Sequence, residues 1–508
     1  MKELDSTRRE ILKLAGGALT ATTFLPFIGR HAVFARPVGK PLVTRVLGRT
    51  GREVTQFGLA GGNTVMWDLP GDQGVETIVK AIRMGVTYLE TANNYQLSQL
   101  NYGKAFRILN LIPGRPGYDA ALRGRLFLAT KSGLRHAIVR DGSKPLGRSA
   151  GGGTLVLDDL RRSLTQFFGD GQGSIPEGAY LDLMQIHSLT RYADVDAVFE
   201  GLENPGDQAL PRVGALAALV DYRDGTNLTG LNPAHKKWIR HIGITGHENA
   251  AAHMYAIRRD SRNLLETLLV AINPNDRFYF SHQYNSIPVA REKGMGIIGM
   301  KLFADGVMYG LEKRFAGKPG QQVFSVGQPG KVPYEDFIQY ALSTPGVSTV
   351  IMGIGLIDKS DDPARDQLLA DIAACQIRDP QTGARRRQVE QRTAELHGTD
   401  TNFFQRTASG LLAPERFLVE DVDPGATRLR WSTAYAGGHP IDRYELYRRD
   451  VQIASLPFMP QLGEELFAYQ DKLAASPAWP GGRYYKVRVV DAAGNTADTR
   501  TVKPEPPA

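Results

Sequence analysis

The chain has 508 residues, of which 42% are hydrophobic and 22% are charged. This balance excludes a largely disordered chain, and the length suffices for one large domain and a smaller one. The formal net charge is +8, but no stripe of aromatic residues accompanies the dispersed basic residues, so nucleic acid is not an expected partner.

Residues 1–35 have the three regions of a signal peptide. A charged start carries Arg8-Arg9 and then Ile-Leu-Lys, an apolar stretch runs from Leu14 to Ile28, and Val33-Phe34-Ala35 offers a cleavage site. The apolar stretch is too short for a stable membrane span. The arginine pair resembles a twin-arginine signal, which implies export of a folded protein to the periplasm or the medium. An ordinary amphipathic helix is the alternative.

Residues 43–395 alternate short β-branched or aromatic runs with segments of helical period. Helices are expected, for example, at Val75–Met84, Leu155–Phe168, Glu248–Arg258 and Tyr334–Leu342. This alternation predicts a (β/α)8 TIM barrel, and the lack of a GxGxxG motif after the first strand disfavours an open doubly wound sheet. The eight predicted strands are Thr55–Ala60, Val86–Glu90, Arg125–Lys131, Asp182–His187, His241–Thr245, Phe278–Gln283, Gly296–Lys301 and Ser348–Met352.

Two connections in this region stand out. Thr44–Leu47 and Glu53–Thr55 flank Thr50-Gly51, which predicts a hairpin ahead of the barrel. Residues 136–154, rich in Gly, Arg and Ser, form a long loop on the side of the barrel where active sites lie. Two interpretations stay open for this loop: a lid over the site, or a surface loop with no role in the site.

A polar linker at residues 396–413 precedes a change of composition. Residues 414–508 contain short alternating segments, which predict a small all-β sandwich. The tail resembles a fibronectin type III module in its Trp431, its paired tyrosines and its closing turn. The resemblance implies attachment to an envelope protein or a polysaccharide rather than chemistry. The predicted strands include Leu429–Trp431, Ile441–Tyr447, Phe467–Asp471 and Tyr484–Val490.

Four polar residues are expected at the C-terminal ends of barrel strands, where TIM-barrel enzymes carry their active sites. They are Glu90, Tyr95, Lys131 and His187. Reduction of a carbonyl leaves an alkoxide, which needs a proton donor beside its oxygen. Tyrosine, with an ordinary pKa of about 10, needs a neighbouring cation such as Lys131 to make it acidic. Glu90 can hold the lysine in place, and His187 can polarise the carbonyl oxygen.

These residues lie in segments that resemble the aldo-keto reductase family. The resemblance implies a catalytic tetrad at Tyr95, Lys131, His187 and Glu90, with Glu90 in place of the family's aspartate. It also implies hydride transfer between a nicotinamide cofactor and an aldehyde, ketone or sugar. The resembling segments are Arg45–Gly62, Gly85–Tyr95, Leu128–Gly133 and Tyr180–Leu189.

The same resemblance implies NADP as the cofactor, with NAD as an alternative. Thr245-Gly246-His247 replaces the family's Ser-Asn pair after strand 5, while Gln283 matches the glutamine that contacts the same nicotinamide amide. The segments after strands 7 and 8 are expected to meet the phosphates. The expected cofactor contacts are therefore Thr245, Gln283, Tyr284, Lys301, Leu302, Gly353 and Lys359.

Three further expectations concern single residues. Tyr192 and Phe199, which follow the fourth strand, are expected to shape the substrate pocket. The Arg385-Arg386-Arg387 run is interpreted as a solvated helix face, and Cys375, the only cysteine, as core filler.

Two functions compete. An exported NAD(P)-dependent oxidoreductase could cross the membrane folded, with its cofactor bound, and would then have to regenerate that cofactor with a second substrate. The alternative is a catalytically lapsed barrel that serves as a binding or scaffold protein at the cell envelope. Retention of Tyr95, Lys131 and His187 together favours the enzyme.

Overall fold

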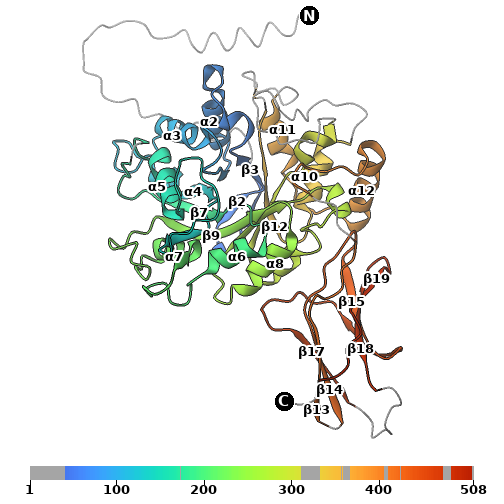
Figure 1. Ribbon diagram of the computed structural model, residues 1–508. Coiled ribbons are helices and arrows are strands. Elements are labelled where there is room, and N and C mark those ends of the chain that lie inside the picture. Colours follow the sequence, from blue (N-terminus) through green and yellow to red (C-terminus); the bar gives the residue numbers. More distant parts are fainter. Residues whose placement is uncertain are drawn as a thin grey trace, which may run out of the picture. The chain divides into compact units, whose positions relative to one another are not determined.

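The computed structural model describes residues 41–171, 173–309, 332–355, 357, 366–405, 410–423, 425–472 and 482–505. The predicted signal peptide and Lys359 lie outside these residues. Eight parallel strands close into a barrel, which confirms the predicted TIM barrel (Figure 1). In chain order they are β3 (Phe57–Ala60), β4 (Tyr88–Glu90), β5 (Phe127–Ser132), β7 (Leu181–Ile186), β9 (Ile239–Gly246), β10 (Thr267–Ala271), β11 (Gly296–Met300) and β12 (Val347–Met352).

Helices surround the barrel (Figure 1). They form because apolar residues recur at helical spacing; in α2, for example, Val75, Ile78, Val79 and Ile82 are all buried. The described helices are α2 (Gln73–Arg83), α3 (Ser98–Ile108), α4 (Ala120–Arg125), α5 (Val156–Phe167), α6 (Tyr192–Phe199), α7 (Ala215–Asp224), α8 (Ala250–Arg259), α9 (Ser286–Glu292), α10 (Tyr334–Leu342), α11 (Gln367–Ala374) and α12 (Gly383–His397). In the described part of the chain, no helix has the length and hydropathy needed to cross a membrane.

The sixth barrel strand differs from its prediction. The strand is β10, at Thr267–Ala271, and a 3-10 helix at Pro274–Phe278 follows it, so the predicted strand at Phe278–Gln283 is wrong. Every residue of β10 is buried, as expected for a parallel strand covered on both faces. The aromatic run at Phe278–Phe280 was taken for the strand because aromatic residues favour strands. Gln283 therefore lies in the connection to α9, well beyond the end of the strand.

The predicted hairpin is confirmed. Strand β1 (Thr44–Val46) pairs antiparallel with β2 (Glu53–Thr55). Leu47 and Val54 of the hairpin are fully buried and belong to the cluster of side chains inside the barrel, together with residues such as Tyr88. The hairpin thus closes one end of the barrel, opposite the C-terminal ends of the strands.

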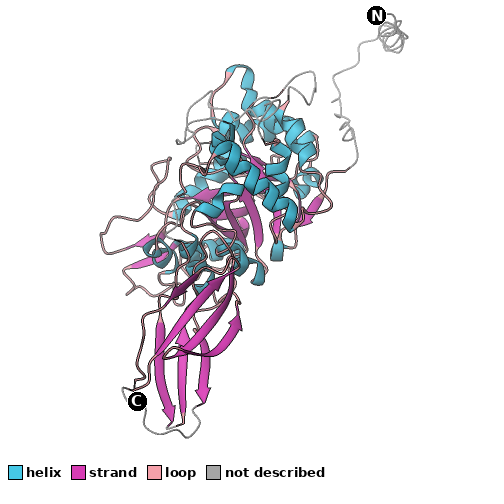
Figure 2. Ribbon diagram, turned by 90° about the vertical axis from the view of Figure 1, so that its right-hand side faces the viewer, coloured by secondary structure: helices cyan, strands magenta, loops and turns pink. Residues whose placement is uncertain are grey.

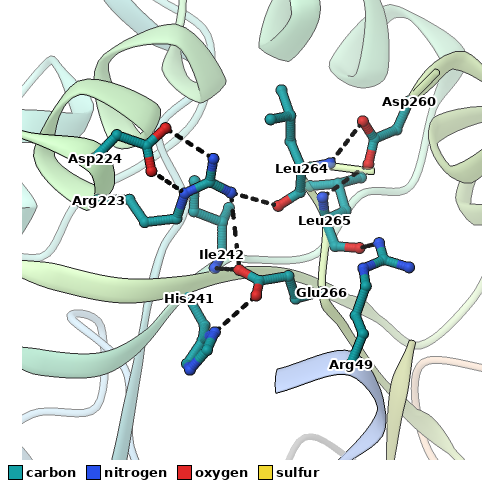
Figure 3. A network of polar contacts seen from close by, with 9 residues as sticks. All are labelled: Arg49, Arg223, Asp224, His241, Ile242, Asp260, Leu264, Leu265 and Glu266. Atoms are coloured by element: carbon teal, nitrogen blue, oxygen red, sulfur yellow. Dashed lines mark hydrogen bonds and ion pairs between the residues drawn. The ribbon is translucent and has the colours of Figure 1, made fainter. Parts of the chain in front are cut away.

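A polar network fastens this hairpin to the barrel (Figure 3). The guanidinium of Arg49 donates to the carbonyl oxygen of Leu265. The next residue, Glu266, accepts hydrogen bonds from the ring of His241 at 2.7 Å and from the backbone of Ile242 at 3.2 Å. Hydrogen bonds therefore join the hairpin to the segment before β10, and that segment to β9, at the end of the barrel opposite the site.

The long loop after the third barrel strand contains a strand of its own. Strand β6 (His136–Val139) pairs antiparallel with β8 (Arg212–Gly214), so the loop is tied to the connection between α6 and α7. This small sheet lies outside the barrel's own ring of strands.

The C-terminal region consists of antiparallel sheets, as predicted (Figure 2). Trp431 is buried between aromatic partners, with ring centroids 5.9 Å from Tyr444 and 5.8 Å from Phe467. One sheet has the order β13 (Phe417–Asp423), β14 (Ala426–Trp431), β17 (Phe467–Lys472), and the other β16 (Val451–Pro457), β15 (Ile441–Arg448), β18 (Tyr485–Asp491), β19 (Thr496–Asp498).

The connection between β14 and β15 bonds to the segment that precedes α9. The side-chain amide of Asn285 donates to the carbonyl of Ala436 at 3.1 Å and accepts from its N–H at 2.8 Å. Both residues are buried. The ring of Tyr435 lies edge-on to Phe280, with centroids 5.6 Å apart. The C-terminal region therefore satisfies a buried amide of the barrel.

The basic run on α12 is only partly solvated. Arg385 and Arg387 are exposed, but Arg386 donates to the carbonyl of Tyr340 and packs on its ring. The expectation of a solvated face is therefore wrong for Arg386. Cys375 is buried, which agrees with its interpretation as core filler.

The packing of the hairpin turn against the barrel can be tested by substituting its two glycines. Gly48 and Gly51 both have positive φ, but a Cβ on Gly48 would overlap the backbone nitrogen of Gly296, whereas a Cβ on Gly51 would meet nothing within 4 Å. We expect Gly51→Ala to lower the free energy of unfolding by about 1–2 kcal/mol, the cost of a left-handed alanine. Gly48→Ala should lower it by clearly more. Equal losses in denaturant titrations would contradict this close packing.

Candidate active site

The four predicted catalytic residues come from adjacent parts of the barrel. Glu90 ends β4, and Lys131 lies near the end of β5, the neighbouring strand. His187 follows β7, and its backbone N–H bonds to the carbonyl of Ser132 at 2.8 Å. Tyr95 lies in the connection between β4 and α3. Because β4, β5 and β7 are consecutive in the barrel, all four reach its C-terminal mouth.

Lys131 is the centre of the group. Its ammonium forms an ion pair with Glu90, and both side chains are only 1% exposed. The ammonium also donates to the carbonyl of Thr91 at 3.0 Å, while the second oxygen of Glu90 accepts from the N–H of Gly61 at 3.4 Å. The additional methylene of glutamate, relative to aspartate, therefore leaves the ion pair intact.

Tyr95 and His187 complete the arrangement. The Lys131 ammonium donates to the Tyr95 hydroxyl at 3.4 Å and lies 4.5 Å from the centre of its ring. The rings of Tyr95 and His187 lie edge to face, with centroids 6.0 Å apart. The structure thus brings together all four residues that the sequence predicted.

The electrostatics differ from the expectation for Tyr95. Burial, with a smaller effect of the Asp305 carboxylate, raises the pKa of Tyr95 to about 12. Burial and the charge of Lys301 lower the pKa of Lys131, whose ammonium is paired with Glu90. Tyr95 therefore keeps its proton at neutral pH, which suits a donor.

Two histidines at the mouth are neutral. Burial lowers the pKa of His187 well below its ordinary value, and the charge of Lys131 lowers it further. Burial and the charge of Lys301 do the same for His247. A neutral imidazole has one N–H donor and one acceptor nitrogen, so each ring can donate a hydrogen bond without a positive charge.

The expected contacts to the nicotinamide amide are only partly present. At the end of β9 the hydroxyl of Thr245 and Nδ1 of His247 are buried without a hydrogen-bond partner in the described part of the chain. By contrast, Gln283 is engaged by the protein: it donates to the carbonyl of Asn273 and accepts from Tyr340 and Arg386. Thr245 therefore lies where the prediction needs it, and Gln283 does not.

Tyr284 also lies away from the site. Its ring packs against the hydrophobic cluster of the C-terminal strands. It was expected to stack on the nicotinamide because it follows Gln283, so both misplacements have the same origin in the wrongly predicted sixth strand.

The expected phosphate contacts are weaker than the sequence suggested. Lys301 follows β11, but its ammonium is engaged by Asp305. Leu302 is buried in the core, and a Cβ on Gly353 would lie 2.7 Å from the Asn63 amide, which explains the glycine. Lys359 lies outside the described residues.

Two residues of the mouth were missed by the sequence analysis. Asp305 pairs with Lys301 through a left-handed backbone and not across a helical turn, so the four-residue spacing gave no signal for the pair. The ring of Phe404 stacks on His247, with centroids 4.4 Å apart at 27°. Phe404 lies in the stretch interpreted as a linker, and nothing in that polar sequence places it at the barrel mouth.

A cavity of about 720 Å³ lies elsewhere, between α6 and the small β6–β8 sheet. Phe199 and His136 line it, whereas Tyr95, Lys131 and His187 do not. The hydroxyl of Tyr192 lies 3.3 Å from that of Tyr435. Phe199 and the long loop therefore form this outer cavity, and their expected part in the substrate pocket stays a prediction.

The sequence of the barrel matches a known protein family. Residues 56–365 match the Aldo/keto reductase family. A comparison with curated proteins finds no match. Among solved structures, an aldo-keto reductase from Bacillus halodurans is 19% identical, with a TM-score of 0.41, over 71% of this chain and 98% of that one. A Klebsiella pneumoniae aldo/keto reductase in complex with NADP and acetate is 14% identical, with a TM-score of 0.41, over 72% and 99%.

The effect of the Lys301 charge on the pKa of His247 can be measured without an activity assay. Since its charge lowers the pKa of His247, Lys301→Met should raise that pKa toward the ordinary value, although burial will still hold it low. The titration of the imidazole nitrogens can be followed by ¹⁵N NMR. Lys104→Met, a change in a lysine on α3 whose ion pair with Asp72 is exposed, is the control. An unchanged His247 titration in Lys301→Met would contradict the proximity of the two groups.

Proposed function

Because the chain belongs to the aldo-keto reductase family, we propose that it is an NADP-dependent oxidoreductase that reduces the carbonyl group of a small molecule. The observation that carries this proposal is the contact of the Tyr95 hydroxyl with the buried Lys131–Glu90 pair. NAD is the alternative cofactor, because the positive charge of Lys301 is neutralised by Asp305.

The residues suit the chemistry of the family. When bound, a nicotinamide cofactor would supply the hydride for the carbonyl carbon. Tyr95 would pass its hydroxyl proton to the carbonyl oxygen, and the ammonium of Lys131 would stabilise the phenolate that is left. His187 is neutral and can donate a hydrogen bond to the same oxygen, which draws electrons from the carbon before the hydride arrives.

The end of β9 fits the cofactor's amide. A carboxamide offers an acceptor oxygen and donor hydrogens, and the unpartnered hydroxyl of Thr245 and Nδ1 of His247 can serve both. Buried polar atoms without partners are costly, so a ligand that pairs with them is stabilised. These two residues would therefore hold the nicotinamide where the family uses a serine and an asparagine.

The alternative is a barrel without turnover that acts as a scaffold at the cell envelope. A barrel of that kind has no need to keep Tyr95, Lys131 and His187 together at its mouth. The intact tetrad supports the enzyme.

We also propose that the protein is exported by the twin-arginine route and acts in the periplasm or outside the cell. Export in the folded state would allow the cofactor to travel inside the barrel. The two antiparallel sheets around Trp431 support a fibronectin type III-like module, for which an envelope protein or a polysaccharide is the proposed partner.

Replacing the proton donor tests the proposed enzyme. Tyr95→Phe removes one oxygen and keeps the ring, so folding and nucleotide binding should survive. Turnover of aldehydes and ketones should fall roughly 10²- to 10⁴-fold, as for loss of a general acid. Equal turnover by wild type and variant would exclude this role for Tyr95, and a wild type that neither binds nucleotide nor reduces any carbonyl would favour the scaffold.

The carboxylate is tested by a graded pair of variants. Glu90→Asp keeps a partner for Lys131 and should change kcat far less than Glu90→Ala, which leaves a buried ammonium unpaired. Measurements of kcat and of thermal stability on both variants would check this order. Similar losses in the two variants would show that the ion pair is not what Glu90 contributes.

Export is tested in cells. Replacing Arg8 and Arg9 by lysine should leave the protein in the cytoplasm, because the twin-arginine system reads the arginine pair. Cell fractionation of wild type and variant gives the result, and unchanged delivery to the periplasm would refute the assignment.

A further inference from the structure

The connection that follows β11 has an unusual backbone. Lys301, Ala304 and Asp305 have φ angles of 60°, 51° and 56°, so three residues with side chains adopt the left-handed conformation within one short segment. The segment is held by neighbours: the Asn273 amide donates to the carbonyl of Lys301 at 3.2 Å, and the N–H of Ala304 donates to it at 2.9 Å. Backbone strain of this kind persists where the structure enforces it, and it concentrates at functional sites.

This backbone presents a carboxylate with a free acceptor. One oxygen of Asp305 accepts from the Lys301 ammonium, while the other, Oδ2, is buried and has no hydrogen-bond partner in the described part of the chain. The side chain of Asp305 is only 7% exposed. Burying a carboxylate oxygen without a hydrogen-bond donor costs free energy. A ligand that donates a hydrogen bond to this atom would therefore be stabilised.

The pair lies beside the catalytic group. The charge of Asp305 acts on Tyr95, and the charge of Lys301 acts on Lys131 and His187. The geometry agrees: Lys301 directly follows β11, so the pair lies at the same C-terminal mouth of the barrel as Lys131 and His187, which lie at the ends of β5 and β7. A ligand group that meets Asp305 would therefore lie near the substrate carbonyl.

An aromatic face adjoins the pair. The Lys301 ammonium lies 5.6 Å from the centre of the Phe404 ring, which also stacks on His247. The segment that carries Phe404 is anchored: the carboxylate of Asp276 accepts from Thr401 at 3.3 Å and from Gln405 at 3.2 Å. Phe404 is therefore held at the mouth.

We propose that Asp305 and Lys301 bind a hydroxyl group of the substrate close to its carbonyl, with Phe404 against the C–H face of the same molecule. The substrate class is then a hydroxylated aldehyde or ketone, such as a small sugar, rather than an apolar carbonyl compound. A hydroxyl donates to the free oxygen of Asp305 and accepts from the ammonium, and carbon-bound hydrogens pack on the aromatic ring. This assignment rests on the proposed function.

A pair of matched substrates tests the assignment. Glyceraldehyde and propanal differ in two hydroxyl groups, and wild type should prefer glyceraldehyde in kcat/KM. Asp305→Asn should reduce this preference about 10- to 100-fold, the effect of losing a hydrogen bond to a charged group, while propanal reduction falls far less. Asparagine tolerates the left-handed conformation well, so the backbone should be kept. Asp224→Asn, which removes the ion pair with Arg223 on α7, is the control.

Two measurements separate this inference from the proposed function. Binding of erythritol, a polyol that cannot be reduced, is followed by calorimetry, and NADPH affinity by fluorescence, in wild type and Asp305→Asn. Erythritol binding that depends on Asp305 supports the inference, even if wild type reduces neither aldehyde. A wild type that reduces neither aldehyde would contradict only the proposed function. Three results would overturn the inference. The first is an unchanged substrate preference in Asp305→Asn, and the second is no erythritol binding by wild type. The third is a variant that loses NADPH affinity while its substrate preference stays the same. The last result would assign Asp305 to a hydroxyl of the cofactor's ribose.

Discussion

The buried ion pair between Lys131 and Glu90 is the interaction on which the site depends. Both side chains are almost completely withdrawn from water, and removal of either would leave a buried charge without compensation. The barrel makes the pair because β4 and β5 are hydrogen-bonded neighbours whose C-terminal ends lie side by side. The ammonium that Glu90 fixes in this way is the one that contacts Tyr95. The position of the ammonium that contacts Tyr95 thus follows from strand pairing.

Burial also determines the charge of three other groups at the mouth. It raises the pKa of Tyr95 and lowers the pKa values of His187 and His247, so each is held in its neutral form. Neutral groups that donate hydrogen bonds can stabilise negative charge that develops on an oxygen. The second pair, Lys301 with Asp305, extends this arrangement past the tetrad.

Three errors of the sequence analysis, in the sixth strand, Gln283 and Tyr284, share one origin. The aromatic run at Phe278–Phe280 was taken for the sixth strand, because aromatic residues favour strands, and β10 was overlooked. Gln283 and Tyr284 were then assigned to the cofactor, whereas they contact Arg386 and the C-terminal cluster. The other seven barrel strands were located to within two residues at each end.

The sequence by itself predicted the barrel, the hairpin and the C-terminal sheets from local periodicity, and it put Glu90, Lys131 and His187 at the ends of strands. Only the tertiary structure decided which atoms lack partners and which segments return to the mouth. Phe404 reaches His247 from far along the chain, and Asp305 turns inward through a left-handed backbone. Neither feature has a local signature, because long-range packing and desolvation depend on the whole fold, and these same effects set the pKa of Tyr95 against the direction that its neighbouring lysine suggested.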